Sequence, residues 1–68
     1  MRISARNFLK GTIVDVKMGQ TTAHVLIDVG GTVITASITN ESVDEMGLKK
    51  GMAAAAVIKS SDVMVAID

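Results

Sequence analysis

The chain has 68 residues, seven basic against seven acidic side chains, a single phenylalanine, and no cysteine, tryptophan or tyrosine. A chain this short forms one domain, residues 1–68, and without cysteine it has neither disulfides nor thiolate zinc sites to stabilise it. Small domains otherwise rely on a metal or on oligomerisation, and with His24 as the only histidine a histidine cage within one chain is excluded. We therefore expect apolar surface to be buried between subunits.

Valine, isoleucine and threonine are abundant, and such β-branched residues fit pleated strands. The first predicted strand covers residues 8–17 and the second covers residues 22–29. Alternation gives each strand one apolar face, formed by Phe8, Val14, Val16 and Met18 in the first and by Ala23, Val25, Ile27 and Val29 in the second. The Gly30-Gly31 pair predicts a tight hairpin into a third strand over residues 32–39, because glycine readily takes the positive φ that such turns need.

The next predicted element is a short helix over residues 40–46. Ser42 and Glu45 have the capping-box spacing, and Thr39 or the residue after it could cap the helix one turn earlier. Gly47 is a natural left-handed residue for the C-terminal end. The helix thus has both a start and a stop signal.

Two further strands are predicted, over residues 52–58 and 63–67, with a polar turn between them. The four alanines at 53–56 would also suit a helix, but the valine, isoleucine and glycine around them favour a strand. These small side chains either fill the core or let another backbone approach closely. The element order is that of an all-β fold, an OB-like five-stranded barrel with one short helix between strands three and four; a small open sheet has the same alternation. The five methionines are interpreted as core filler.

Composition also limits the function. Zero net charge and a single aromatic ring disfavour nucleic-acid binding, which needs phosphate-neutralising cations and stacking rings. No apolar run reaches the length of about 18 residues that spans a membrane, and the N-terminus lacks a signal-peptide core, so we expect no membrane partner and a cytoplasmic location. No catalytic constellation and no phosphate-binding glycine loop stand out, which makes an enzyme the least favoured class.

Polar residues gather in three short patches at predicted strand or helix ends, residues 4–7, 39–42 and 59–61. They offer two cations, Arg6 and Lys59, with hydroxyls and the N–H groups of a helix start, which are the donors that hold a small oxyanion. Each part also has a structural interpretation. Polar residues at a helix start are commonly caps, lone surface cations are commonly solvated, and serines between strands commonly form turns.

Four segments spaced along the whole chain resemble the Mop family of molbindins, small cytoplasmic molybdate-binding proteins. The segments are Ser4-Ala5-Arg6-Asn7 with Gly11, Ala36-Ser37-Ile38-Thr39 with Ser42, Met46-Gly47-Leu48 with Gly51, and Ile58-Lys59-Ser60 with Asp62-Val63. The whole chain is one such module, so the resemblance is to a stand-alone molbindin rather than to the regulators and transporter subunits that carry the same module.

The resemblance implies an OB-like barrel that assembles as a hexamer, a trimer of dimers, and binds molybdate or tungstate at its subunit interfaces. The oxyanion-binding residues it implies are Ser4, Ala5, Arg6, Asn7, Lys59 and Ser60 of one subunit, with Thr39 and Ser42 of a neighbouring subunit. Molybdenum would be held as the oxyanion, with no direct metal ligand, no covalent cofactor and no catalysis. The implied role is storage and homeostasis of the anion.

Two other functions are compatible with part of the sequence. The element order alone also suits an OB-type nucleic-acid-binding module, which the charge and the missing rings disfavour. Direct binding of a pterin would favour an aromatic stacking surface, and the chain has only Phe8 to offer.

Overall fold

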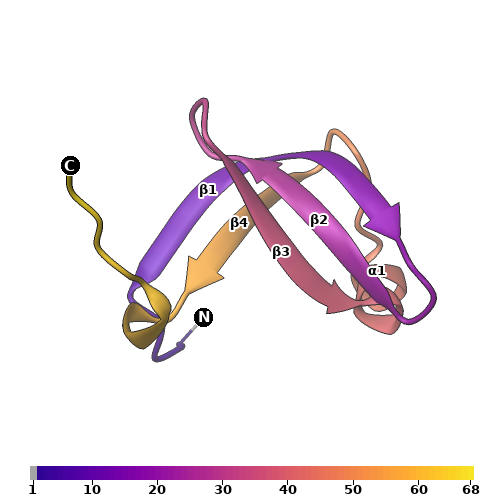
Figure 1. The fold of residues 1–68 in the computed structure, drawn as a ribbon. Coiled ribbons are helices and arrows are strands. Elements are labelled where there is room, and N and C mark those ends of the chain that lie inside the picture. Colours follow the sequence, from indigo (N-terminus) through magenta and orange to yellow (C-terminus); the bar gives the residue numbers. More distant parts are fainter. Residues whose placement is uncertain (1) are drawn as a thin grey trace.

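The computed structural model describes residues 2–68, which form four strands and one helix. The elements are β1 (Asn7–Met18), β2 (Thr22–Asp28), β3 (Val33–Thr39), α1 (Asn40–Met46), β4 (Ala53–Ile58) and the 3₁₀ turn η1 (Ser60–Asp62). Neighbouring strands are antiparallel, in the spatial order β3-β2-β1-β4. The sheet curls into an arch, with α1 at the end where β3 finishes (Figure 1). The mainly β class and the helix between strands three and four are confirmed.

β1 is shared between the two halves of the arch. Its first half pairs with β4, from Asn7 opposite Ile58 to Thr12 opposite Ala53, and its second half pairs with β2. The register shifts within the second half, at a bulge between residues 13 and 15. Such a bulge bends the strand and changes which alternate residues face inward.

The predicted apolar face of β1 is wrong at both ends of the strand. Ile13 is 1% exposed, whereas Phe8 and Met18 are 48% and 50% exposed. Ile13 faces the core before the bulge and Val16 packs against the core after it. Inward-facing residues are odd-numbered before the bulge and even-numbered after it. A prediction that applies one alternating pattern to the whole strand cannot reproduce this change.

β2 supplies the centre of the core, as its alternation predicted. Ala23, Val25 and Ile27 are all buried. The hairpin that follows is also confirmed, with φ of 85° at Gly30 and 99° at Gly31. Both angles lie in the region that glycine takes without steric cost.

α1 has the predicted bounds, and its N-cap is Thr39 rather than Ser42. Gly47 ends the helix in the left-handed conformation, with φ of 62°. Val43 is buried and joins the helix to the core. Within residues 2–68, no helix is long and apolar enough to cross a membrane.

The alanine run forms β4 rather than a helix, as predicted. Ala56 is buried and Ala54 packs against the core, so the alanines on this face act as core filling. Close approach of another backbone occurs instead on β1, where a Cβ added to Gly11 would collide with the carbonyl oxygen of Asp28. The crossing of β1 over the end of β2 therefore depends on glycine at this position.

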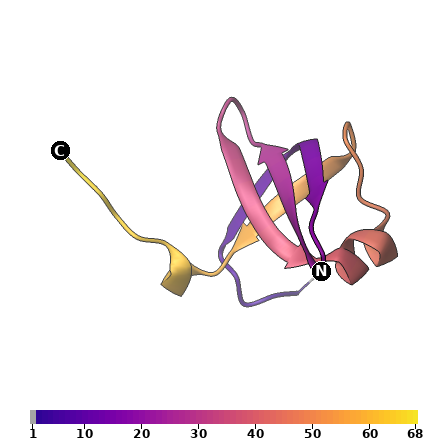
Figure 2. The ribbon, with the colours of Figure 1, turned by 45° about the vertical axis from the view of Figure 1, so that its right-hand side comes forward.

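The predicted fifth strand is wrong for this chain. Residues 63–68 follow η1 without strand conformation and project away from the sheet (Figures 1 and 2). Met64, Val65 and Ile67 are 92%, 90% and 93% exposed. The arch is therefore a half-barrel of four strands and not a closed five-stranded barrel. Alternation marks a segment that suits a strand, but it does not say which strand edge, or which chain, that segment pairs with.

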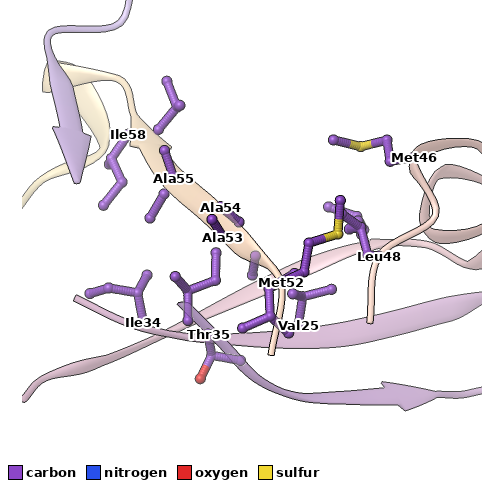
Figure 3. Close-up of a pocket in the computed structure, with 16 residues that line it drawn as sticks. Val25, Ile34, Thr35, Met46, Leu48, Met52, Ala53, Ala54, Ala55 and Ile58 are labelled. Carbon is purple, nitrogen blue, oxygen red and sulfur yellow. The ribbon is translucent and has the colours of Figure 1, made fainter. Parts of the chain in front are cut away.

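The interpretation of the methionines as core filler is wrong for Met18, Met46, Met52 and Met64, which are all exposed. Met46 and Met52 instead line an apolar cavity of about 650 Å³ on the concave side of the arch (Figure 3). We call this cavity the apolar groove. Its other walls come mainly from β3 and β4, including Ile34, Ala36, Ile38 and Ala53 to Ile58.

Candidate oxyanion site

The first and third polar patches meet at one end of the sheet. Asn7 begins β1 opposite Ile58, the last residue of β4, and the Asn7 amide nitrogen Nδ2 donates to the Ile58 carbonyl oxygen at 3.1 Å. Because these residues face each other, the chain before Asn7 and the chain after Ile58 leave the sheet from adjacent positions (Figure 1). Arg6 and Lys59 are the flanking residues, so the fold unites two cations that are far apart in sequence.

This joined patch is open to solvent at the groups that could hold an anion. Both serines and both cations are exposed, whereas Ala5 and Asn7 are half-buried. The segment that carries Lys59 is held by the η1 turn, in which the Asp62 N–H donates to the Lys59 carbonyl oxygen at 2.9 Å. Two positive side chains and two hydroxyls therefore lie at the surface, where Arg6 directly precedes β1 and Lys59 directly precedes η1.

The second polar patch lies at the opposite end of the arch. Thr39 ends β3 opposite Thr22, beside the end of β1 at Met18, whereas the joined patch lies at the start of β1 (Figure 1). β1 has 12 residues, and a strand rises about 3.3 Å per residue. Thr39 and Ser42 therefore cannot share an anion with Arg6 and Lys59 of the same chain. Their origin in a neighbouring subunit stays a prediction.

Thr39 and Ser42 have different hydrogen-bonding roles. The Thr39 hydroxyl oxygen accepts from the Ser42 N–H at 3.1 Å and donates to the Ser42 hydroxyl oxygen at 2.9 Å. A hydroxyl has one proton, so that of Thr39 is committed within the cap. The Ser42 hydroxyl still has its proton available, which makes Ser42 the better donor to an anion and Thr39 its support.

Asn40 is a positioning residue that sequence patterns did not reveal. Its N–H donates to the Thr21 carbonyl oxygen at 2.8 Å and its side-chain Nδ2 donates to the Gly19 carbonyl oxygen at 2.9 Å. These bonds tie the start of α1 to the turn between β1 and β2. The sequence indicated Asn40 only as an alternative cap, because its real partners lie about twenty residues away.

Direct metal coordination has no support in the part of the chain that the structure describes. Residues 2–68 contain no group of three or more His, Cys, Asp or Glu side chains that could hold an ion. His24 is exposed on β2, with Lys17 and Ser37 as its cross-strand neighbours. The chemistry that the surface offers is hydrogen-bond donation and positive charge.

Comparison with known proteins identifies the family. The TOBE domain model matches residues 3–65, and molybdenum-pterin-binding protein 1 of Clostridium pasteurianum is 52% identical over 66 residues, which cover 96% of this chain and 97% of the relative. The chain belongs to the Mop family of TOBE domains. The expected resemblance is thus confirmed, as is the expectation of a binding protein rather than an enzyme.

Two solved Mop-family structures share the fold. A molybdate-binding protein from Sporomusa ovata superposes with a TM-score of 0.94 at 33% identity, covering 98% of this chain and 100% of that one. The cytoplasmic molybdate-binding protein ModG, in a crystal form with molybdate bound, gives a TM-score of 0.90 at 48% identity. That match covers 94% of this chain and 46% of ModG, so the Mop module here corresponds to about half of the ModG chain.

Proposed function

We propose that this Mop protein binds molybdate or tungstate as the intact oxyanion and stores it in the cytoplasm. Binding would take place at the subunit interfaces of a homo-oligomer, a hexamer arranged as a trimer of dimers. The observation that carries the proposal is the meeting of residues 4–7 with residues 59–60 at one end of the sheet. ModG, described as cytoplasmic and solved with molybdate bound, and the relatives named for molybdenum support it.

Charge balance would come from Arg6 and Lys59. Molybdate is a tetrahedral dianion at neutral pH, so two local cations neutralise it even though the chain as a whole has no net charge. Arginine offers a rigid fork of donors and lysine a point charge. Ser4 and Ser60 add hydroxyl donors, and the backbone N–H groups of Ala5 and Asn7 would fill the remaining acceptor directions on the four oxygens.

A site made only of donors also accounts for selectivity. Phosphate carries a proton near neutral pH, and that proton needs an acceptor which such a site lacks. Sulfate has the same charge as molybdate but is smaller, so donors spaced for molybdate would be too far apart to reach all of its oxygens. Size therefore separates the two dianions, and protonation separates phosphate from both.

The second half of the site would come from a neighbouring subunit. Thr39 and Ser42 lie at the far end of the arch from Arg6, so one chain presents one half-site at each end. In a symmetric assembly, the α1 end of one subunit would face the η1 end of the next. Ser42 would then donate its free hydroxyl proton to the anion that Arg6 and Lys59 neutralise.

Calorimetric titration of the purified protein with molybdate, with sulfate as a competitor, tests the proposal directly. We expect heat at micromolar protein that saturates and that excess sulfate does not abolish. Native mass spectrometry on the same sample should show a hexamer that gains discrete molybdate masses. The proposal is wrong if molybdate gives no heat or if sulfate binds with equal affinity. A parallel titration with a pterin tests whether the chain binds that ligand, which the names of the relatives mention.

Single substitutions test which residues bind the anion. We expect Arg6→Ala and Lys59→Ala each to raise the Kd for molybdate by roughly 10- to 150-fold, because a hydrogen bond to a charged group contributes about 1.5–3 kcal/mol. Lys49→Ala removes the same charge from an exposed turn and is the matched control, which should bind as the wild type does. An unchanged Kd in Arg6→Ala or Lys59→Ala removes that residue from the site.

A further inference from the structure

The Ile58 carbonyl group lies where the two cation-bearing segments of the proposed oxyanion site meet. It belongs to the peptide unit that leads from β4 to Lys59, and the residue opposite it is Asn7, which directly follows Arg6. A carbonyl oxygen carries partial negative charge and accepts hydrogen bonds. An uncovered carbonyl at this position would therefore repel an anion without protons and would attract one that carries a proton.

The Asn7 side chain covers this carbonyl. Its Nδ2 donates to the Ile58 carbonyl oxygen at 3.1 Å, in a partly buried hydrogen bond between residues that are 51 positions apart. The backbone pairing of β1 with β4 extends from this pair to Thr12 opposite Ala53, so many other residues hold the two strands together. The side-chain bond at the end of the pairing thus adds something besides alignment, namely a donor on an acceptor beside both cations.

The next two carbonyls along the chain are covered as well. Within η1, the Asp62 N–H donates to the Lys59 carbonyl oxygen at 2.9 Å, and the Val63 N–H donates to the Ser60 carbonyl oxygen at 3.2 Å. The carbonyl oxygens of residues 58, 59 and 60 therefore all have a donor from the same chain. At residue 58 this donor is a side chain, so a substitution can remove it and leave the backbone bonds of η1 in place.

We propose that Asn7 is a specificity-determining residue, whose side-chain amide covers the Ile58 carbonyl and so keeps the site free of an acceptor for protonated oxyanions. The proposal rests on the proposed function and assigns the rejection of hydrogen phosphate to one side-chain hydrogen bond. The Asn7 amide acts through the Ile58 carbonyl and does not itself need to touch the anion.

Comparison of hydrogen phosphate with sulfate separates this effect from size and charge. At mildly alkaline pH both ions are tetrahedral dianions of similar size, but hydrogen phosphate keeps one proton that needs an acceptor. A site that is merely loosened would change its affinity for both ions alike. An uncovered carbonyl would favour only the ion that carries a proton, so the ratio of the two dissociation constants reports whether the carbonyl is exposed.

Competition calorimetry measures this ratio on the full chain. The protein is titrated with molybdate in the presence of hydrogen phosphate or of sulfate, first as the wild type and then as Asn7→Ala. We expect Asn7→Ala to lower the Kd for hydrogen phosphate relative to the Kd for sulfate by roughly 2- to 10-fold, which corresponds to the gain of one hydrogen bond.

A second variant keeps the shape of the side chain. Asn7→Asp replaces the donor at Nδ2 with a carboxylate oxygen, which cannot cover the Ile58 carbonyl and is itself an acceptor. Its negative charge should weaken the binding of every anion. The ratio of the dissociation constants should nevertheless shift toward hydrogen phosphate, in the same direction as in Asn7→Ala.

Gly11→Ala is the control for a loss of stability. Its new Cβ collides with the carbonyl group of Asp28, so it strains β1 while the Asn7 amide remains. We expect its ratio of dissociation constants to equal that of the wild type. Circular dichroism shows for each variant whether the chain is folded.

The outcomes separate this proposal from the proposed function. A wild-type chain that gives no heat with molybdate overturns both. A wild type that binds molybdate, with an unchanged phosphate-to-sulfate ratio in either folded variant of Asn7, overturns the role of Asn7 alone. The role of Asn7 is also overturned if the wild type binds hydrogen phosphate as tightly as sulfate, because an acceptor such as the exposed Asp62 carboxylate would then already serve the site.

Discussion

The cap of α1 allows structural support and anion binding to be tested separately. Thr39 holds the Ser42 N–H, whereas the Ser42 hydroxyl keeps a free proton. We therefore expect Thr39→Val to destabilise the fold. We expect Ser42→Ala to weaken molybdate binding while it leaves stability nearly unchanged, because the bond from the backbone N–H at position 42 to Thr39 remains.

The magnitudes follow from these two bonds. Loss of an N-cap side chain costs about 1 kcal/mol, which lowers the Tm of a domain of this size by roughly 4–8 °C. Ser42→Ala removes a hydroxyl at the edge of the helix and should cost at most about 0.5 kcal/mol, no more than half of that shift. The lost donor to a dianion should raise the Kd by roughly 10- to 150-fold.

Thermal unfolding followed by circular dichroism measures the first effect, since the chain has no tryptophan or tyrosine for fluorescence. Protein concentrations must be matched, because the Tm of an oligomer depends on concentration. Calorimetry with molybdate measures the second effect. Thr39→Ser keeps the hydroxyl and is the control, so its Tm and its Kd for molybdate should equal those of the wild type. The reasoning is refuted if Ser42→Ala melts as low as Thr39→Val or binds molybdate as tightly as the wild type.

Two further substitutions test the scaffold. Gly11→Ala should lower the free energy of unfolding by about 1–3 kcal/mol, because the new Cβ collides with the backbone of Asp28. Thr12→Ala, at the exposed neighbouring residue, is the control. If the two variants have the same melting curve, the close approach at Gly11 is contradicted. Asn40→Ala should cost about 0.5–1.5 kcal/mol, because its hydrogen bond to the exposed Gly19 carbonyl oxygen is lost and water takes its place. Urea unfolding measures it, and an unchanged midpoint would mean that the tie does not stabilise the fold.

Local patterns predicted the parts of the fold that depend on local chemistry. The Gly30-Gly31 hairpin and the cap residues of α1 act through φ angles and nearby hydrogen bonds, so sequence alone indicates them. The prediction of the inward face of β1 was wrong because one bulged residue reverses the alternation between Ile13 and Val16. The bulge is visible only in the register of β1 against β2, beside the Asp15 carboxylate that accepts from the Val16 N–H at 2.9 Å.

The candidate site was predicted in composition rather than in geometry. Arg6 and Lys59 stood out as cations within polar patches, but only the pairing of Asn7 with Ile58 brings the patches together. Hydroxyl protons could not be assigned from sequence, because their use depends on distances such as the 2.9 Å between Thr39 and Ser42. The segments that resemble the family implied both the expected ligands and their division between two subunits, and the topology adds that the two groups of residues lie at opposite ends of the arch.

The proposed division of the oxyanion site between two subunits would link anion binding to assembly. Residues 63–68 project from the sheet and leave Val65 and Ile67 in solvent, and burial of each such side chain contributes about 1.5–3 kcal/mol. A subunit contact that covers these side chains would stabilise the fold, and the proposed site places Lys59 at a subunit boundary. An anion bound across that boundary favours the assembled state by mass action. In such a protein the loss of subunit contacts and the release of the anion are coupled, because each weakens the other.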